Sequence, residues 1–264
     1  MTGLKAKLGE GRTVTGCFVK HPSPGIVEVI AFLGWDFVVV DAEHGPIDRL
    51  SCENVIRAAE TGGSAAVVRV PSIGRAPILQ ALDSGAEGIQ APLVGSRADA
   101  EAAVALAKYA PAGTRGLASV RALSYGLVGS MAENVARANE RSLVVCQIET
   151  AAGLDALDGI CAVPGVDVVF VGPTDLGQSL GVVGQREHPD LVAAIDRIAE
   201  TVLEAGKVFG ILVGDEADAV EWQRRGARYL CFNIEGLLRA SSQRIHAAVG
   251  AGGRQRAPRE RVRS

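Results

Sequence analysis

The sequence predicts an α/β fold, a closed (β/α)8 TIM barrel of eight parallel strands with helices between them. Short β-branched runs alternate along the chain with longer stretches rich in Ala, Leu and charged residues, which is the pattern of repeated βα units. Aromatic residues make up only 4% of the 264 residues, so the core must be built from Val, Ala, Leu and Ile. That composition is typical of buried parallel strands covered by helices. A doubly wound open sheet is the alternative.

Eight runs have the length and composition of strands. They cover residues 14–19, 37–41, 65–70, 88–92, 143–149, 166–171, 208–213 and 228–234. The intervening stretches are predicted to be helical at residues 24–33, 48–61, 74–84, 96–109, 151–162, 189–205, 215–225 and 235–249. Eight strands, each followed by a helix, match the barrel.

Residues 1–249 are expected to form a single barrel domain, because no repeat or linker divides them. Residues 111–130 are a long Gly- and Ser-rich connection, and connections of that length are usually lids or binding loops. The tail, residues 250–264, has five arginines against one glutamate and no core-forming residues. We expect this basic tail to be disordered rather than an arm for nucleic acid.

Composition also restricts the partners and the location. A net charge of −3 provides no general attraction to nucleic acid or to a membrane. The amino terminus lacks an apolar signal region, and no apolar run is long enough to span a bilayer, so we expect a cytoplasmic protein. The five cysteines include no CxxC pair and three lie in strand-like runs, which favours small buried thiols over disulfides or a zinc site.

Polar residues gather where four predicted strands end. In such barrels the active site lies at the carboxyl ends of the strands, so these side chains should share one mouth. They are Asp41, Glu43 and His44 after the second strand, Arg69 at the third, Gln147 and Glu149 at the fifth, and Asp175 after the sixth.

Glu149 and Asp175 follow neighbouring strands, so their carboxylates can converge. Two close carboxylates repel unless they share a proton or a cation, and a site made of oxygen ligands suits Mg²⁺, Mn²⁺ or Co²⁺. Alternatively, each carboxylate caps the helix that follows it.

Arg69 and His44 are candidates for binding and proton transfer. A guanidinium at a buried strand end can bind a carboxylate or a developing oxyanion through two parallel hydrogen bonds, or it can form a structural ion pair with Asp41 or Glu43. Histidine is the side chain type best suited to proton transfer near neutral pH, which makes His44 a candidate, although a lone loop histidine is often an ordinary surface residue.

Several other chemistries lack their motifs. No GxGxxG follows a strand, and neither a P-loop nor a GxSxG elbow is present. Of the five lysines, only Lys20 lies near the carboxyl end of a predicted strand. A Schiff-base aldolase needs such a lysine, so activation by a metal ion is favoured over an imine.

With these motifs the sequence resembles the HpcH/HpaI aldolases, the class II pyruvate-dependent family, over roughly residues 4–249. The resemblance rests on six stretches in the same order: GWDFVVVDAEHGPID, VVRVPSIG, LDSGAEGIQAPLV, YAPAGTRG, CQIETAAGLD and VFVGPTDLGQSLG.

The resemblance implies roles for particular residues. Glu149 and Asp175 match the two metal ligands, and Arg69 matches the arginine that binds the donor and its enolate. His44 matches the histidine that transfers protons through water. Asp83 matches an aspartate that reaches this histidine from a neighbouring subunit. Gln147 matches a polar residue of the donor site, and the donor carboxylate is expected near the backbone of Gly172, Pro173, Thr174 and Asp175.

The implied function is cleavage or formation of 4-hydroxy-2-oxo acids, giving pyruvate (or a close 2-oxo acid such as hydroxypyruvate) and an aldehyde. The alternatives are an aldolase for sugar-derived 2-keto-3-deoxy acids, an acyl-CoA lyase, an oxaloacetate decarboxylase, or a barrel without catalysis. The family is usually hexameric, a trimer of dimers that exchanges its last helix. We expect the aldehyde pocket to be lined by the 111–130 segment, residues 20–25, residues 213–215 and a neighbouring subunit, with Arg115, Arg121 and Ser124 as candidate contacts.

Overall fold

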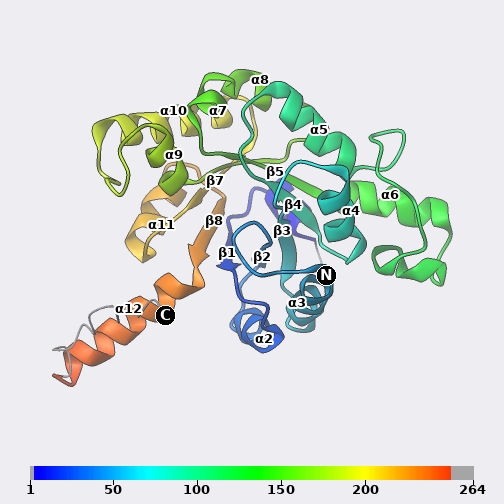
Figure 1. The fold of residues 1–264 in the computed structure, drawn as a ribbon, viewed down its shortest axis with the longest axis horizontal. Helices are drawn as coiled ribbons and strands as arrows, with labels where there is room; N and C mark the ends of the chain where they lie inside the picture. Colours follow the sequence, from blue (N-terminus) through cyan, green and yellow to red (C-terminus); the bar gives the residue numbers. More distant parts are fainter. Residues whose placement is uncertain (1–2, 251–264) are drawn as a thin grey trace, which may run out of the picture.

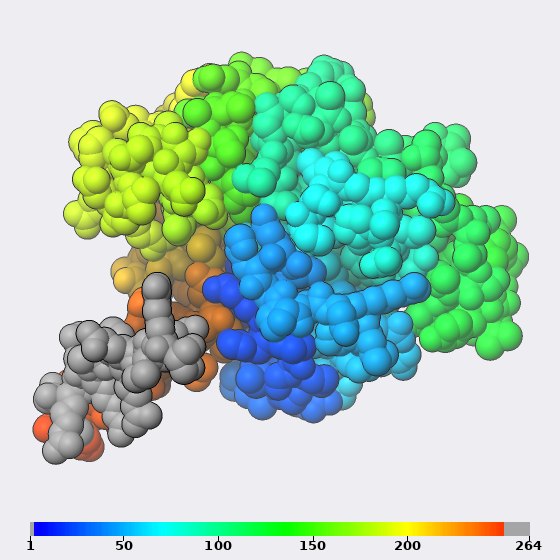
Figure 2. Space-filling model, viewed as in Figure 1, coloured from blue at the N-terminus to red at the C-terminus, as the bar shows by residue number. Residues whose placement is uncertain are grey.

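The computed structural model describes residues 3–250, which Figure 1 and Figure 2 colour from blue to red along the chain. Eight parallel strands pair in chain order, and β8 pairs with β1 from Val14–Tyr229 to Phe18–Asn233, so the sheet closes (Figure 1). The predicted (β/α)8 barrel is confirmed, and the open-sheet alternative is wrong because no strand edge is left unpaired. The strands are β1 (Val14–Val19), β2 (Phe37–Asp41), β3 (Ala65–Arg69), β4 (Gly88–Ala91), β5 (Leu143–Ile148), β6 (Val168–Val171), β7 (Val208–Leu212) and β8 (Tyr229–Asn233).

The helices between strands lie close to their predicted positions, and the one predicted at 151–162 is divided at Ala156. They are α2 (Pro24–Phe32), α3 (Arg49–Thr61), α4 (Arg75–Asp83), α5 (Arg97–Ala107), α7 (Ala151–Asp155), α8 (Leu157–Cys161), α10 (Pro189–Glu204), α11 (Glu216–Arg224) and α12 (Ile234–Ala248). Four elements lie outside the predicted helices: α1 (Leu4–Gly9), the 3-10 helix η1 (Arg121–Gly126), α6 (Met131–Arg141) and α9 (Pro173–Ser179). The start of α6 is marked by a capping box between Ser130 and Glu133.

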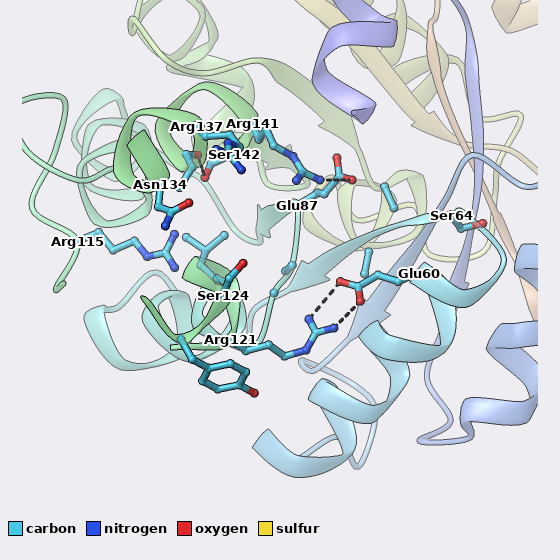
Figure 3. Close-up of a pocket in the computed structure, with 18 residues that line it drawn as sticks. Glu60, Ser64, Glu87, Arg115, Arg121, Ser124, Asn134, Arg137, Arg141 and Ser142 are labelled. Atoms are coloured by element: carbon cyan, nitrogen blue, oxygen red, sulfur yellow. Dashed lines mark hydrogen bonds and ion pairs between the residues drawn. The ribbon is translucent and has the colours of Figure 1, made fainter. Parts of the chain in front are cut away.

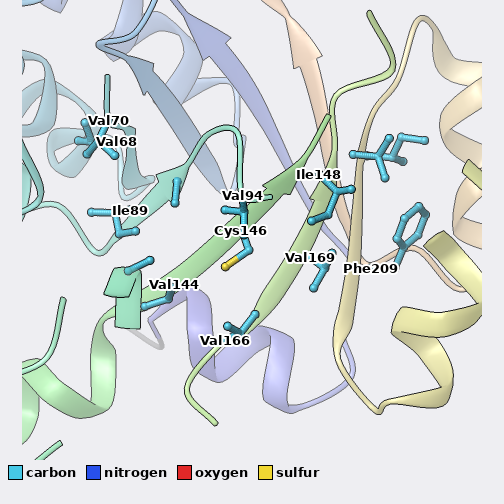
Figure 4. Close-up of a cluster of buried hydrophobic side chains, with 14 of the residues drawn as sticks. Val68, Val70, Ile89, Val94, Val144, Cys146, Ile148, Val166, Val169 and Phe209 are labelled. Atoms are coloured by element: carbon cyan, nitrogen blue, oxygen red, sulfur yellow. The ribbon is translucent and has the colours of Figure 1, made fainter. Parts of the chain in front are cut away.

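Alternate residues of each strand face opposite sides of the sheet, which produces two apolar layers. The inner layer fills the barrel with side chains such as Phe18, Phe37, Phe170 and Tyr229, and α1 contributes Leu4 and Leu8 to it. The outer layer lies between sheet and helices and consists mainly of Val, Ile, Leu and Ala (Figure 4). This is the aromatic-poor core that the composition predicts.

All five cysteines are buried and unpaired. Burial raises the pKa of the Cys17 and Cys146 thiols to about 12, so both are neutral, unreactive core groups. The prediction of buried strand cysteines is therefore confirmed.

The 111–130 segment lies at the amino ends of the strands. It follows α5, which runs from the carboxyl end of β4 back to the other end of the barrel. Arg121, Ser124 and Tyr125 accordingly line a cavity with Ala65 at the start of β3 and Ser142 just before β5. The expectation that this segment lines the aldehyde pocket is wrong for the chain's own barrel.

Of the predicted tail at 250–264, residues 251–264 lie outside the described part of the chain. Among residues 3–250, no helix combines the length and apolarity needed to cross a membrane.

Candidate active site at the carboxyl ends of the strands

Polar side chains replace apolar ones at the last inward positions of the strands. Asp41, Arg69 and Gln90 pair in register across β2, β3 and β4, one level above the inner apolar layer. Gln147 continues the ring on β5, where it pairs with Phe170 of β6. The alternation of each strand therefore brings distant polar residues into one mouth.

Asp41 and Arg69 form a two-pronged ion pair at the base of this mouth. Nε of Arg69 donates to Oδ1 of Asp41 at 3.0 Å and Nη2 donates to Oδ2 at 2.6 Å, while the guanidinium lies 4.9 Å from the ring centre of Phe18. Nε is also 3.3 Å from Oε2 of Glu43. Burial alone would raise the pKa of Asp41, but the hydrogen bond and charge of Arg69 hold it below its ordinary value.

The structural ion pair considered for Arg69 is therefore present, and it leaves one edge of the guanidinium available. Within residues 3–250, Nη1 of Arg69 donates to no protein acceptor, and Arg69 lines a cavity of about 130 Å³ at the mouth. An ion pair that fixes one edge orients the other toward a ligand.

Asp41 also shapes the turn that carries His44. Its Oδ1 accepts the backbone N–H groups of Glu43 at 3.2 Å and His44 at 3.1 Å, and its carbonyl accepts the N–H of Gly45 at 3.1 Å. A Cβ on Gly45 would lie 2.5 Å from the carbonyl oxygens of Asp41 and Lys20, so only glycine fits. The turn presents His44 at the mouth with its side chain 55% exposed.

Glu149 is held by a buried hydrogen-bond chain. Its Oε1 accepts the backbone N–H of Leu93 at 2.7 Å, and its Oε2 accepts Nε2 of Gln147. Gln147 in turn accepts from Gln90 at 2.5 Å. Leu93 has a φ of 52°, a costly conformation for leucine that turns its N–H toward the carboxylate.

Gly172 and α9 form the facing wall. A Cβ on Gly172 would lie 3.0 Å from both Nε2 of Gln147 and Oε2 of Glu149, so the glycine leaves room for this pair. Asp175 lies in the first turn of α9 but provides no side-chain cap, and α7 is capped by Thr150 rather than Glu149. Neither carboxylate therefore has the capping role that was the alternative.

The electrostatics of the mouth suit a cation. Burial raises the pKa of Glu149, partly opposed by its hydrogen bonds and increased by the charges of Asp175 and Glu43. Burial likewise raises the pKa of Glu43, despite the opposing charge of Arg69. Oε2 of Glu43 is buried and lacks a hydrogen-bond partner. A divalent cation would relieve this excess of negative charge.

The side chains available as metal ligands also agree with a divalent cation such as Mg²⁺. Across residues 3–250, no three His, Cys, Asp or Glu side chains converge as a ligand set. Glu149 and Asp175 line one cavity together with Glu43 and His44. Mg²⁺ is commonly held by one or two carboxylates, with substrate and water as its other ligands.

The structure gathers most of the predicted site residues. His44, Arg69, Gln147, Gly172, Thr174 and Asp175 line the 130 Å³ cavity. Pro173 is buried at the start of α9.

Asp83 is elsewhere. It ends α4 at the opposite end of the barrel, where its Oδ1 accepts from Nη2 of the buried Arg115 at 2.9 Å. Any contact between Asp83 and His44 therefore requires a second subunit.

Several residues of the mouth are not singled out from the sequence for a role there, among them Phe18, Gln90, Leu93 and Asn233. A glutamine inside the apolar run GIQA was the signal for Gln90, because a buried amide needs partners. Nothing in the sequence around Leu93 indicates its positive φ.

Fold and mouth together define a barrel enzyme with a carboxylate pair, an oriented arginine and a histidine at the carboxyl ends of its strands. The sequence profile of the HpcH/HpaI aldolase/citrate lyase family matches residues 14–240, and the chain belongs to this family. It is accordingly a carbon–carbon lyase.

Relatives extend the comparison. The chain is 36% identical over 244 residues to a 5-keto-4-deoxy-D-glucarate aldolase of Shigella boydii, covering 92% of this chain and 94% of that protein. Its structure is similar to that of an HpcH/HpaI aldolase from Desulfitobacterium hafniense, with a TM-score of 0.88, 31% identity and coverage of 98% and 100%. It is also similar to the citrate synthase SbnG, with a TM-score of 0.85, 33% identity and coverage of 96% and 99%.

Proposed function

We propose that this lyase is a metal-dependent, class II aldolase that cleaves a 4-hydroxy-2-oxo acid into an aldehyde and pyruvate or a close 2-oxo acid such as hydroxypyruvate. The observation that carries the proposal is the buried Glu149 carboxylate, fixed by Leu93 and Gln147 beside Asp175, in a mouth that also contains Arg69 and His44.

Glu149 and Asp175 would hold Mg²⁺, Mn²⁺ or Co²⁺. Such a cation, when bound, would polarise the C2 ketone of a 2-oxo acid, so that the electrons of a breaking C3–C4 bond are more readily accepted. Residues of the chain would stabilise the developing negative charge, bind the donor carboxylate and transfer protons.

Arg69 supplies fixed positive charge. Asp41 holds one edge of the guanidinium, so Nη1 can donate to the oxygen on which negative charge develops without first reorganising. The donor carboxylate can accept from the backbone at the start of α9, because the first N–H groups of a helix have no acceptor within it.

His44 is the proton carrier in this proposal. During cleavage the 4-hydroxyl loses its proton toward His44, directly or through water, and the C3–C4 electrons move onto the 2-oxo acid fragment. A proton added at C3 completes pyruvate. Asp83 of a second subunit would orient the histidine, in a hexamer built as a trimer of dimers.

The name of the Shigella boydii relative favours a sugar-derived acid as the substrate of this chain. Counted from its ketone end, 5-keto-4-deoxy-D-glucarate is itself a 4-hydroxy-2-oxo acid with a second carboxylate, so the general reaction and the sugar-acid alternative coincide in this compound. We therefore place sugar-derived diacids first among candidate substrates, and a cytoplasmic location remains our expectation.

A coupled assay tests the proposal. Pyruvate release from 5-keto-4-deoxy-D-glucarate and from 4-hydroxy-2-oxoheptanedioate is followed with lactate dehydrogenase, and the aldehyde is trapped in parallel. Equal amounts of the two products are expected. Turnover of oxaloacetate or an acyl-CoA thioester, with neither aldol substrate cleaved, would replace this reaction with a decarboxylase or a thioester lyase.

A further inference from the structure

A second cavity lies at the opposite end of the barrel from the proposed active site, and we propose that it binds a small anion bearing carboxylate or phosphate oxygens. It measures about 410 Å³, large enough for a small metabolite. Its walls come from η1 and α6 and from the amino ends of β3 and β4, and four arginines line it: Arg115, Arg121, Arg137 and Arg141 (Figure 3).

Two of the arginines are fixed at the cavity wall by ion pairs. Arg121 binds both carboxylate oxygens of Glu60 and donates to the carbonyl of Ser84 at 2.9 Å. Nη2 of Arg141 donates to Oε1 of Glu87 at 3.0 Å. Both ion pairs are drawn in Figure 3, and they hold the guanidinium groups in place before any ligand arrives.

The other two arginines have unused donors. Arg137 is exposed and makes no ion pair or side-chain hydrogen bond within the described part of the chain. The side chain of Arg115 is 2% exposed and lies over the ring of Tyr109, and its one hydrogen bond is from Nη2 to Asp83. Its buried Nε has no partner. Each guanidinium carries five N–H donors, so most of the donor capacity of this pair is available to a ligand.

The charged side chains around this cavity also favour the binding of an anion. Three carboxylates, Asp83, Glu60 and Glu87, pair with three of the four arginines. Arg137 forms no ion pair in the described part of the chain, and only the nearby charge of Glu133 opposes its own. A site at the amino end of a barrel usually serves stability, but stability alone favours paired charges and satisfied donors. An anion would satisfy both the charge of Arg137 and the unused edge of Arg115.

Backbone strain also concentrates here. Among residues 3–250, the non-glycine residues with positive φ are Leu93, at 52°, and the neighbours Ser124 and Tyr125, at 50° and 55°. Leu93 serves the carboxylate of the proposed active site, whereas Ser124 and Tyr125 line this second cavity. Strained backbone is typically retained where a ligand or a reaction needs it.

Isothermal titration of the full, metal-free chain with inorganic phosphate, and separately with malonate, tests the proposal. Saturable binding of at least one is expected, and the tighter of the two identifies the anion class. Arg137→Gln should weaken that binding about tenfold. Arg197→Gln removes another exposed arginine, on α10, and should leave it unchanged.

Two further variants complete the test. Arg115→Gln should abolish binding. Binding that is kept in Arg115→Gln but lost in Arg69→Gln would place the anion in the mouth of the proposed active site and would overturn the proposal. If neither anion binds saturably, or if Arg137→Gln binds as the unchanged chain does, the proposal is wrong. Because the readout is binding rather than turnover, it is independent of the proposed aldolase activity.

Discussion

At the scale of single residues, the mouth of the barrel contains charged groups that an ordinary core would exclude. Glu149 is 2% exposed, and its two oxygens accept hydrogen bonds from a strained backbone N–H and a buried amide rather than from a cation of the protein. Such an arrangement lowers the stability of the metal-free protein in return for a preorganised site.

Replacing Glu149 tests whether its buried carboxylate lowers the stability of the metal-free protein. Because burial raises the folded-state pKa of Glu149, its contribution to stability is complete below the ordinary glutamate range and is lost as pH rises through the raised pKa. At neutral pH, EDTA-treated Glu149→Gln should therefore be more stable than the unchanged protein by about 1 kcal/mol in urea unfolding. The difference should shrink as pH falls. A variant that is less stable at every pH would mean that the hydrogen bonds to the ionised group outweigh its burial.

Arg69→Lys keeps the charge and removes the two-pronged geometry. Lysine cannot hold Asp41 by one edge while donating from the other, so we expect kcat/KM for pyruvate release to fall about 100-fold or more. Arg57→Lys changes an exposed ion pair with Glu53 and is the matched control, with activity and melting temperature unchanged. Full activity of Arg69→Lys would remove the oriented guanidinium from the mechanism.

At the scale of elements, the period-two alternation of the strands made most of the mouth predictable. Inward residues at the strand ends had to meet once the sheet closed, so Arg69 and Glu149 could be placed from the sequence. The segment 111–130 could not, because its composition indicates a loop but not the end of the barrel at which it lies. The left-handed backbone of Leu93 was also unpredictable, since it is determined by tertiary contacts rather than by leucine itself.

The last helix packs against the barrel only at its first turn, through Ile234 and Leu237. In Figure 1, α12 extends away from the barrel, and it has no buried residue, with Leu238 and Ile245 60% exposed or more. We expect the double substitution Leu238→Asp and Ile245→Asp to reduce the oligomer mass measured by analytical ultracentrifugation. Val220→Asp alters a similarly exposed residue on α11 and should not. An unchanged mass in the double variant would contradict a role for α12 in assembly.

At the scale of the whole molecule, the position of Asp83 predicts an active site shared between subunits. Asp83→Asn and His44→Asn should each be inactive alone. When the two are unfolded together and refolded, mixed oligomers should regain part of the activity, because some interfaces then pair an intact His44 with an intact Asp83. No recovery in oligomers shown by mass spectrometry to be mixed would indicate that Asp83 acts only within its own subunit, through Arg115.

Metal dependence is the central claim, and one measurement tests it most directly. Pyruvate release from a 4-hydroxy-2-oxo acid is measured with EDTA-treated protein and again after addition of Mg²⁺, Mn²⁺ or Co²⁺. We predict that activity disappears on chelation and returns with at least one of the three ions, but not in Glu149→Gln. Cleavage that is indifferent to EDTA would contradict a cation held by Glu149 and Asp175, and would direct attention to Lys20 and an imine.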